Sequence, residues 1–236
     1  MSLLALLDRS ILFIHVLAGF ITLASGFASM WTQKGGKAHR RWGKVFFWAM
    51  FTIFITSFGT IFIFRFNPFL LGINIFAFYM AFTGYRVVYR KRDANGQNAQ
   101  LIDWIAVLLA TTGALYLMFW GALVITENVA IAWSSTFGIL AIVLGAFILF
   151  MALWEDARLF RRPTTDRRWW WYYHMERMLG AMIGAVTAFL VQQLGTSALL
   201  GNLSWLPWVL PGVLGGIGIN YWVGYYRRKF NRVRTH

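Results

Sequence analysis

The sequence predicts an all-α fold, a polytopic membrane helical bundle of about seven transmembrane helices. The first observation is composition: 59% of the 236 residues are hydrophobic and 13% are charged, whereas soluble domains have about 25% charged residues. The second is that apolar residues form seven runs of about 20, the length that crosses a bilayer as a helix. The third is that nearly all Lys and Arg residues lie in or beside alternate connections between these runs and in the C-terminal tail. A soluble domain would need more charged residues to cover its surface.

Seven apolar runs define the expected spans. They cover residues 11–31, 45–64, 69–88, 101–125, 130–153, 171–194 and 206–226. The first follows Asp8 and Arg9 rather than a basic start, and it lacks a signal-peptide cleavage pattern, so we expect it to remain as a helix. The seventh begins with Pro207 and Pro211, which suit the first turns because no amide hydrogen is needed there. Together the runs predict a single transmembrane domain over residues 1–236.

The connections mark where the second to sixth spans begin and end. A basic segment precedes the second span, residues 65–68 separate the second from the third, and the polar turn 93–98 precedes the fourth. Residues 126–129 follow the fourth span. A second basic segment, ending in the aromatic run 169–173, precedes the sixth, and the uncharged segment 195–205 precedes the seventh.

The basic residues predict the orientation. Twenty of the 22 Lys and Arg residues fall in the first, third and fifth connections, at the adjoining helix starts and in the C-terminal tail, and only Arg9 and Arg65 fall on the other side. Short cytoplasmic connections retain Lys and Arg, whereas translocated ones do not. We therefore expect the N-terminus outside and the C-terminus in the cytoplasm, in a multi-pass protein of the cell inner (cytoplasmic) membrane.

Composition also excludes several kinds of chemistry. The chain has no cysteine, so it has no disulfide, thiolate metal site or cysteine nucleophile. The net charge of +14 reflects topology and not nucleic-acid binding, because the basic residues are spread between apolar runs. The motifs of zinc hydrolases and phosphate loops are absent, so no metal site of that kind is expected. The expected partners are membrane lipids, with a membrane protein or a second copy of the chain as a further possibility.

Small residues predict where helices pack closely. Gly19, Thr22 and Gly26 share one face of the first span, and Gly180 and Gly184 share one face of the sixth. The seventh span is rich in glycine. Small residues spaced in this way allow helix backbones to approach one another. The first, sixth and seventh spans are therefore expected to form the tightest seam.

Ionisable residues near the apolar runs are the candidate ligand-binding residues, because an unpaired charge in a bilayer is unfavourable. They are His15, His39, His174, Glu176, Arg177 and Asp103. His15 is expected near the outer end of its span and the others toward the cytoplasm. Anchoring at the membrane interface is the simplest interpretation of the cytoplasmic group. The functional interpretation is a pocket that binds a small ligand or lipid, or a surface that docks a membrane partner, without enzymatic activity.

Two other functions remain open, and the cofactor stays unknown. A redox protein could carry haem b or react with quinone, and haem b needs two imidazoles that face one another. Because a bilayer core is about 30 Å thick, His15 cannot share an iron with a cytoplasmic histidine, which leaves His39 and His174 as the alternative haem ligands. The remaining function is small-solute or proton transport, for which Asn74 is among the few mid-helix polar residues.

Two segments also suggest a family. The sequence HVLAGFITLASG from His15, followed by KGGKAHRRWGKV from Lys34, resembles the predicted bacterial membrane proteins of domain-of-unknown-function family 2306. The sequence HMERMLGAMIGAVTAF from His174 is similar to relatives of that group. This resemblance covers the first, second and sixth spans. It implies no particular activity, but it favours His15, His39 and His174 as functional residues.

Overall fold

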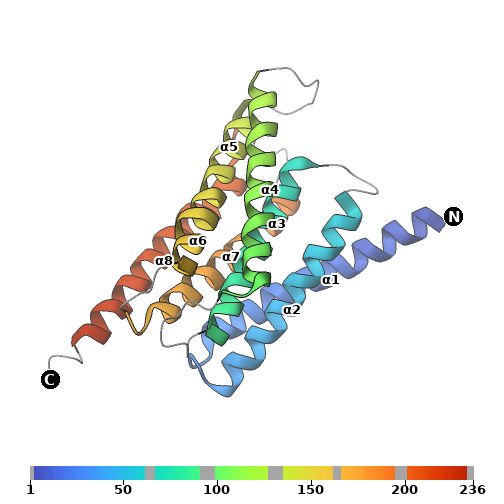
Figure 1. The fold of residues 1–236 in the computed structure, drawn as a ribbon. Helices are drawn as coiled ribbons and strands as arrows, with labels where there is room; N and C mark the ends of the chain where they lie inside the picture. The colour runs from blue at the N-terminus through green and yellow to red at the C-terminus, as the bar shows by residue number, and fades with distance from the viewer. Residues whose placement is uncertain are drawn as a thin grey trace.

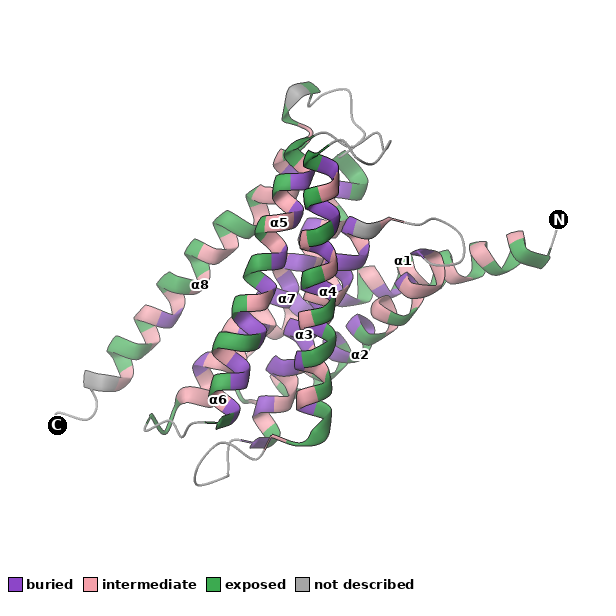
Figure 2. Ribbon diagram, turned by 45° about the horizontal axis from the view of Figure 1, so that its top comes forward, coloured by how far each residue is buried: buried purple, intermediate pink, exposed green. Residues whose placement is uncertain are grey.

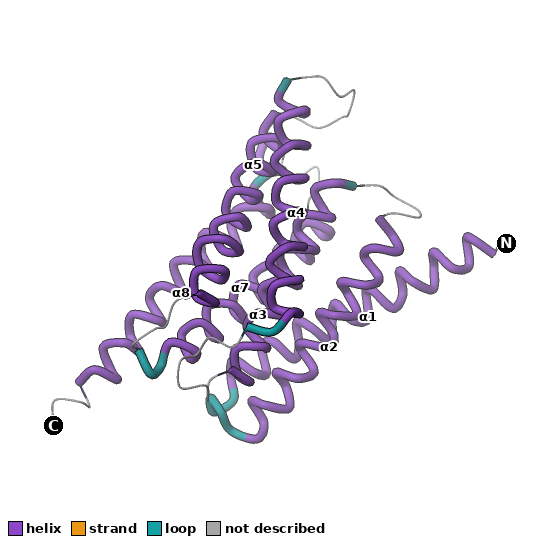
Figure 3. Tube along the Cα trace, viewed as in Figure 1, coloured by secondary structure: helices purple, strands orange, loops and turns teal. Residues whose placement is uncertain are grey.

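A computed structural model describes residues 3–61, 67–90, 99–126, 135–161, 166–194 and 201–232, and every element in these ranges is helical (Figures 1 and 3). The long helices are α1 (Leu3–Trp31), α2 (Lys37–Gly59), α3 (Pro68–Arg90), α4 (Leu101–Ile125), α5 (Ser135–Leu149), α7 (Trp169–Leu194) and α8 (Leu206–Arg232). A π-helical segment, η2 (Phe150–Asp156), joins α5 to the short α6 (Ala157–Arg161), and a 3-10 turn, η3 (Gly201–Leu203), precedes α8.

Within the described residues, seven helices are long and apolar enough to cross a membrane. They are α1, α2, α3, α4, the continuous helix from Ser135 to Arg161, α7 and α8. Their number and order confirm the all-α membrane bundle that the sequence predicts. The protein is therefore a multi-pass membrane protein by length and apolarity of its helices.

Several helices extend beyond the apolar runs that predicted them. The first helix begins at Leu3 instead of residue 11, and the second at Lys37 instead of residue 45. The fifth continues to Arg161 instead of ending at residue 153. Lys, Arg and Ala are good helix formers, so a helix continues where the apolar run has ended. Residues 62–64 and 130–134 of the expected spans lie outside the described residues.

The packing places α3 and α7 at the centre of the bundle. Helix α1 packs mainly against α2, α4 packs against α5, and α7 packs against both α3 and α8. Helix α3 is the most buried of the seven spans, and Figure 2 shows the buried residues concentrated on α3, α4 and α7. The first half of α1 and much of α8, which lie on opposite flanks of the bundle in Figure 2, are exposed. In a membrane protein such apolar exposed faces suit contact with lipid.

The tightest seam differs from the one that the small residues predicted. A Cβ atom placed on Gly121 of α4 would lie 2.6 Å from the backbone oxygen of Gly138 on α5, and one placed on Gly84 of α3 would lie 2.9 Å from the Cβ of Arg177 on α7. In α8, Gly215 approaches the side chain of Ile183 on α7, whereas Gly212, Gly216 and Gly218 have nothing within 4 Å. Glycine permits close packing but does not choose the partner helix. The closest backbone approach of these glycines is therefore between α4 and α5, and the most extensive packing of α7 is against α3.

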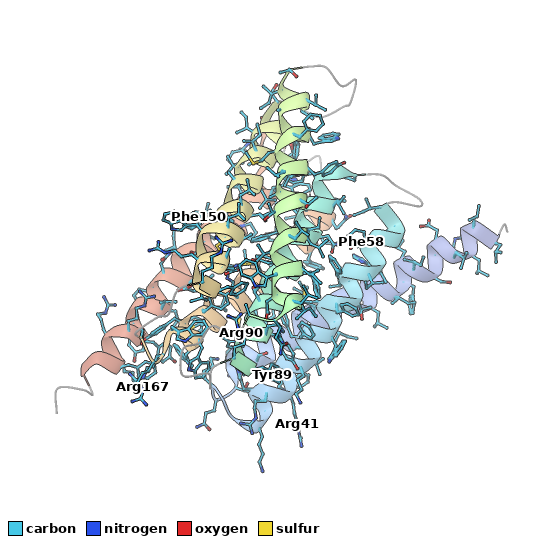
Figure 4. All side chains as sticks on the ribbon, in the orientation of Figure 1. Arg41, Phe58, Tyr89, Arg90, Phe150 and Arg167 are labelled. Atoms are coloured by element: carbon cyan, nitrogen blue, oxygen red, sulfur yellow. The ribbon has the colours of Figure 1, made fainter. Side chains whose placement is uncertain are left out.

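The basic ends of the helices gather at one end of the bundle. Figure 4 shows Arg41, Tyr89, Arg90 and Arg167 at this end, and Phe58 and Phe150 nearer the other. The turn between α1 and α2, the end of α3 and the start of α7 all meet there (Figure 1). We call it the basic end of the bundle.

Candidate functional site

Two histidines from different helices meet at the basic end. His39 lies in the first turn of α2 and His174 lies in the second turn of α7. Their ring centroids are 6.3 Å apart, and the ring planes make an angle of 78°. Two of the histidines that the sequence singled out are thus neighbours in space although 135 residues separate them in the chain.

A tight turn brings His39 to this position. Gly35 has a φ angle of 77°, a backbone conformation that glycine adopts without a steric cost. The turn reverses the chain between Trp31, where α1 ends, and Lys37, where α2 begins. His39 therefore lies beside the last turn of α1, where carbonyl oxygens lack partners within the helix.

Each imidazole is fixed by a backbone carbonyl. His39 Nδ1 lies 3.0 Å from Ser29 O, in the last turn of α1, and His174 Nδ1 lies 2.7 Å from Gly84 O, in α3. A carbonyl oxygen only accepts, so each Nδ1 carries the hydrogen and donates it. In a neutral imidazole Nε2 then holds the lone pair that can accept a hydrogen or bind a metal.

The histidine pair lines a cavity of about 320 Å³. Its walls come from α1, α2, α3, α7 and α8, and they are mainly apolar: Phe46, Met178, Met182, Trp171, Trp222 and Tyr226 are among them. Ligand pockets in proteins have volumes of about 300–1,000 Å³ and walls of this apolar and aromatic kind, with few polar groups. We call this cavity the histidine pocket.

Three basic side chains also line the histidine pocket, namely Lys34, Arg40 and Lys44. Lys34 Nζ donates to Ser29 O at 3.3 Å and also to Met30 O, and it lies 5.9 Å from the centre of the Trp222 ring. Partial burial lowers the pKa of Lys34 from its usual value, because the charged form loses contact with water. Arg40 Nη1 donates to Gly35 O at 2.8 Å. An anionic group at this wall would meet positive charge.

His15 lies far from this pocket. Its Nδ1 is 3.0 Å from Thr56 Oγ1 on α2, and Thr56 is 17 residues after His39, or about 25 Å along the helix. Because α1 begins at Leu3, His15 is about 18 Å from the start of its helix, not near the outer end as the apolar run predicted. The distance along α2 separates His15 from the histidine pair.

Arg177 belongs to a second, buried cluster between α3, η2 and α7. Its side chain is 1% exposed, and its Nη2 lies 2.6 Å from Asp156 Oδ1 and 3.0 Å from Glu155 Oε2. Tyr173 donates to Asp156 Oδ1 at 2.6 Å, and Tyr79 donates to Asp156 Oδ2. The Arg177 guanidinium also lies 4.7 Å from the centre of the Tyr173 ring. The charge of Arg177 is therefore matched by carboxylates and does not face the histidine pocket.

Asp103 belongs to a third cluster, at the start of α4. Arg86 binds it through two hydrogen bonds, from Nε to Oδ1 at 3.0 Å and from Nη2 to Oδ2 at 2.9 Å. Asp103 Oδ2 also accepts from the Gln100 amide at 2.9 Å and so caps the helix. Arg90 Nη1 lies 4.0 Å from Asp103 Oδ1. Asp103 thus links α3 to α4, and it is not among the residues that line the pocket.

The structure brings together His39 and His174 and separates them from the other candidates. Glu176 is half-buried and, like Arg177 beside it, does not line the histidine pocket. Sequence reasoning missed Tyr79 and Tyr173, which bind Asp156. The only available signal was charge complementarity between Glu155, Asp156 and Arg177. This complementarity did not indicate that the three side chains are buried, because the fifth span was expected to end before Glu155.

Comparisons of the chain with family models, with curated proteins and with solved structures gave no match.

Proposed function

We propose that this protein lies in the cell inner membrane and binds an organic cofactor in the histidine pocket, at the basic end of the bundle. The cofactor would have an apolar body and an anionic group, and the protein would bind it without catalysing a reaction on it. The observation that carries this proposal is the meeting of His39 and His174 at the wall of an apolar pocket of about 320 Å³. Such pockets with a few convergent polar groups are the usual sites of small-molecule binding.

The chemistry of the walls supports an amphiphilic ligand. Met, Phe and Trp side chains would contact an apolar body, while Lys34 and Arg40 would attract an anionic group. The acyl chain of a lipid would use only the apolar part of this lining. Two imidazoles held by backbone carbonyls add directional groups that interfacial anchoring does not require.

A transport path receives less support. Asn74, the mid-helix polar residue on which such a path would depend, donates from Nδ2 to Phe54 O at 3.2 Å and so ties α3 to α2. The buried charges at Asp156 and Arg177 bind one another. These polar groups act as links between helices in this arrangement.

The proposal is tested by blocking the histidine pocket at Gly43. Gly43 lies one turn after His39, it lines the pocket, and a Cβ atom there would meet nothing within 4 Å. We expect Gly43→Phe to fold but to lose the bound molecule, because the new ring occupies its space. The measurement is mass spectrometry of small molecules extracted from protein purified in detergent.

Gly218→Phe is the matched control, because Gly218 is an exposed glycine of α8 with nothing within 4 Å and does not line the pocket. We expect wild type and Gly218→Phe to retain the same molecule in about equal amounts. Equal retention by Gly43→Phe would overturn the proposal.

A further inference from the structure

We infer that the cofactor is haem b and that His39 and His174 bind its iron from opposite sides. This inference rests on the proposed function, since it names the molecule that the histidine pocket holds. The observations that carry it are the spacing of the two rings, the way each ring is oriented, the number of donor groups and the charge at the wall.

The spacing of the rings fits one metal atom between them. Two imidazoles that bind one metal from opposite sides, each through a metal–nitrogen bond of about 2.0–2.1 Å, have ring centres about 6 Å apart. The centroids of His39 and His174 are 6.3 Å apart. The centroids of two rings stacked face to face would lie closer together. Two rings that only line the same pocket could have centroids at any distance. The two helices α2 and α7 therefore hold the rings at a separation that accommodates an iron between them, and this separation also lies in the range of an edge-to-face ring contact.

The orientation of each ring also fits a metal ligand. Histidines that bind metals almost always donate their second ring nitrogen to a carboxylate, a backbone carbonyl or water, which fixes the tautomer and the ring plane. His39 donates from Nδ1 to Ser29 O at 3.0 Å and His174 donates from Nδ1 to Gly84 O at 2.7 Å. When neutral, both rings thus have the tautomer whose lone pair is on Nε2, the nitrogen through which we propose that they bind the iron. The two carbonyls come from α1 and α3, so four helices fix the pair.

The number of donors points to a metal that brings its own ligands. In the described part of the chain, no group of three or more His, Asp or Glu side chains is arranged to hold a metal ion. Two imidazoles alone do not complete the coordination of zinc, which takes four ligands in structural sites. A porphyrin supplies four nitrogens to its iron, so two histidines complete six-coordination. Such iron carries single electrons, and it has no open position for a substrate.

The walls of the pocket fit the rest of the haem. Met178, Met182 and Trp171 give the apolar contact that a porphyrin ring needs, and Lys34, Arg40 and Lys44 are cations within reach of the same pocket. Haem b carries two propionates, and a carboxylate near these side chains gains charge-assisted hydrogen bonds. Both ends of the molecule therefore meet complementary chemistry.

The first experiment is an absorption spectrum of the purified protein, oxidised and then reduced with dithionite. We expect a Soret band and, after reduction, the sharp α-band of six-coordinate low-spin haem b. His39→Ala and His174→Ala should each lose these low-spin features. His15→Ala is the matched control, because His15 binds Thr56 at 3.0 Å, away from the pocket, and it should keep the wild-type spectrum. Loss of the bands in all three variants alike, or in none, would overturn the inference.

The second experiment separates iron ligation from simple occupation of the pocket. Haemin and metal-free protoporphyrin IX, which share the ring and the propionates, are titrated into protein expressed without haem supply, and binding is followed by quenching of tryptophan fluorescence. We expect His39→Ala to weaken haemin binding by at least tenfold and to leave protoporphyrin IX binding nearly unchanged. Added imidazole should restore the low-spin spectrum of haemin in His39→Gly, because it replaces the missing ligand.

The outcomes distinguish the two proposals. If both porphyrins bind equally well with and without the two histidines, iron ligation by His39 and His174 is overturned, but binding of a cofactor in the histidine pocket is supported. Failure of both porphyrins to bind would overturn the haem inference. If a different molecule is then lost in Gly43→Phe, the proposed function stands without haem, and if Gly43→Phe loses nothing, both proposals fail.

Discussion

Arg177 shows how a single charged residue is accommodated inside the bundle. The guanidinium is 1% exposed and Asp156 is fully buried, and they lie 2.6 Å apart. Burial of one charge alone would be very unfavourable, so each partner is stable mainly because the other is present. Tyr79 and Tyr173 satisfy further oxygen lone pairs of Asp156. The cluster therefore fixes the positions of α3, η2 and α7 relative to one another.

Removing one partner of this pair is expected to destabilise the protein strongly. Asp156→Leu leaves Arg177 with only the half-exposed Glu155 as an anionic partner, and we expect the free energy of unfolding to fall by about 3–5 kcal/mol. Adding Arg177→Met should restore a large part of this loss, since the uncompensated charge is then gone. The measurement is SDS-induced unfolding in mixed micelles.

Arg41→Met is the control for that pair, because Arg41 is exposed at the basic end, and its effect should stay within about 0.5 kcal/mol. If Arg177→Met lowered the free energy of unfolding equally in wild type and in the Asp156→Leu variant, Arg177 and Asp156 would not be energetically coupled, and the prediction would be wrong.

At the scale of helices, Gly84 determines how closely α3 and α7 approach. A Cβ atom there would lie 2.9 Å from Arg177 Cβ and 3.1 Å from Met178 Cγ, so a larger residue must separate the helices. The same glycine presents the carbonyl that accepts from His174. The seam between α3 and α7 thus supports both the buried charge cluster and the histidine pocket.

Gly84→Leu is therefore expected to reduce stability and to disturb the pocket together. Overpacking a close contact costs about 1–3 kcal/mol, and the shift of α3 should lengthen the bond from His174. Unfolding in mixed micelles measures the first effect, and retention of the small molecule measures the second. Gly216→Leu on α8, where nothing lies within 4 Å, should change neither. A variant Gly84→Leu with wild-type stability would show that the seam can adjust without cost.

The segment η2 is the second feature at this scale. A π-helical turn inserts an extra residue into an α-helix, and such turns are rare and frequent at functional sites. Here the segment Phe150–Asp156 continues the fifth span to Arg161, and it presents Glu155 and Asp156 toward Arg177 on α7. The irregular turn therefore coincides with the buried charge cluster.

At the scale of the whole molecule, the basic residues lead us to propose that the N-terminus is outside and the C-terminus cytoplasmic. Short connections rich in Lys and Arg remain in the cytoplasm, and the basic ends of the helices gather at one end of the bundle (Figures 1 and 4). The histidine pocket lies at that end, so its cofactor would be reached from the cytoplasmic side.

Reporter fusions at His236 test this orientation. We expect green fluorescent protein at this position to be fluorescent and alkaline phosphatase to be inactive, since the phosphatase needs export to fold. A fusion of each reporter after Thr126, at the end of α4, is the internal control and should give the opposite result. Active phosphatase at His236 would reverse the proposed orientation.

The sequence by itself determined the fold class and the sidedness of charge. Both follow from properties that each segment carries alone: an apolar run of membrane length must satisfy its own backbone as a helix, and Lys and Arg bias each connection separately. It also named His39 and His174 and set His15 apart from them, although its reason, a position near the outer face, was wrong: His15 lies near the middle of α1 and contacts Thr56, far along α2 from His39. The resemblance to family 2306 stays a prediction.

Only the tertiary structure decided which residues meet. Glu176 follows His174 by two positions and Arg177 by three, yet Arg177 faces Asp156 and Glu155 while His174 faces His39, because successive side chains point to different sides of a helix. The extension of the fifth helix through η2 and the pairing of α3 with α7 depend on packing between distant segments. Those long-range contacts leave no local pattern in the chain, and they created the histidine pocket.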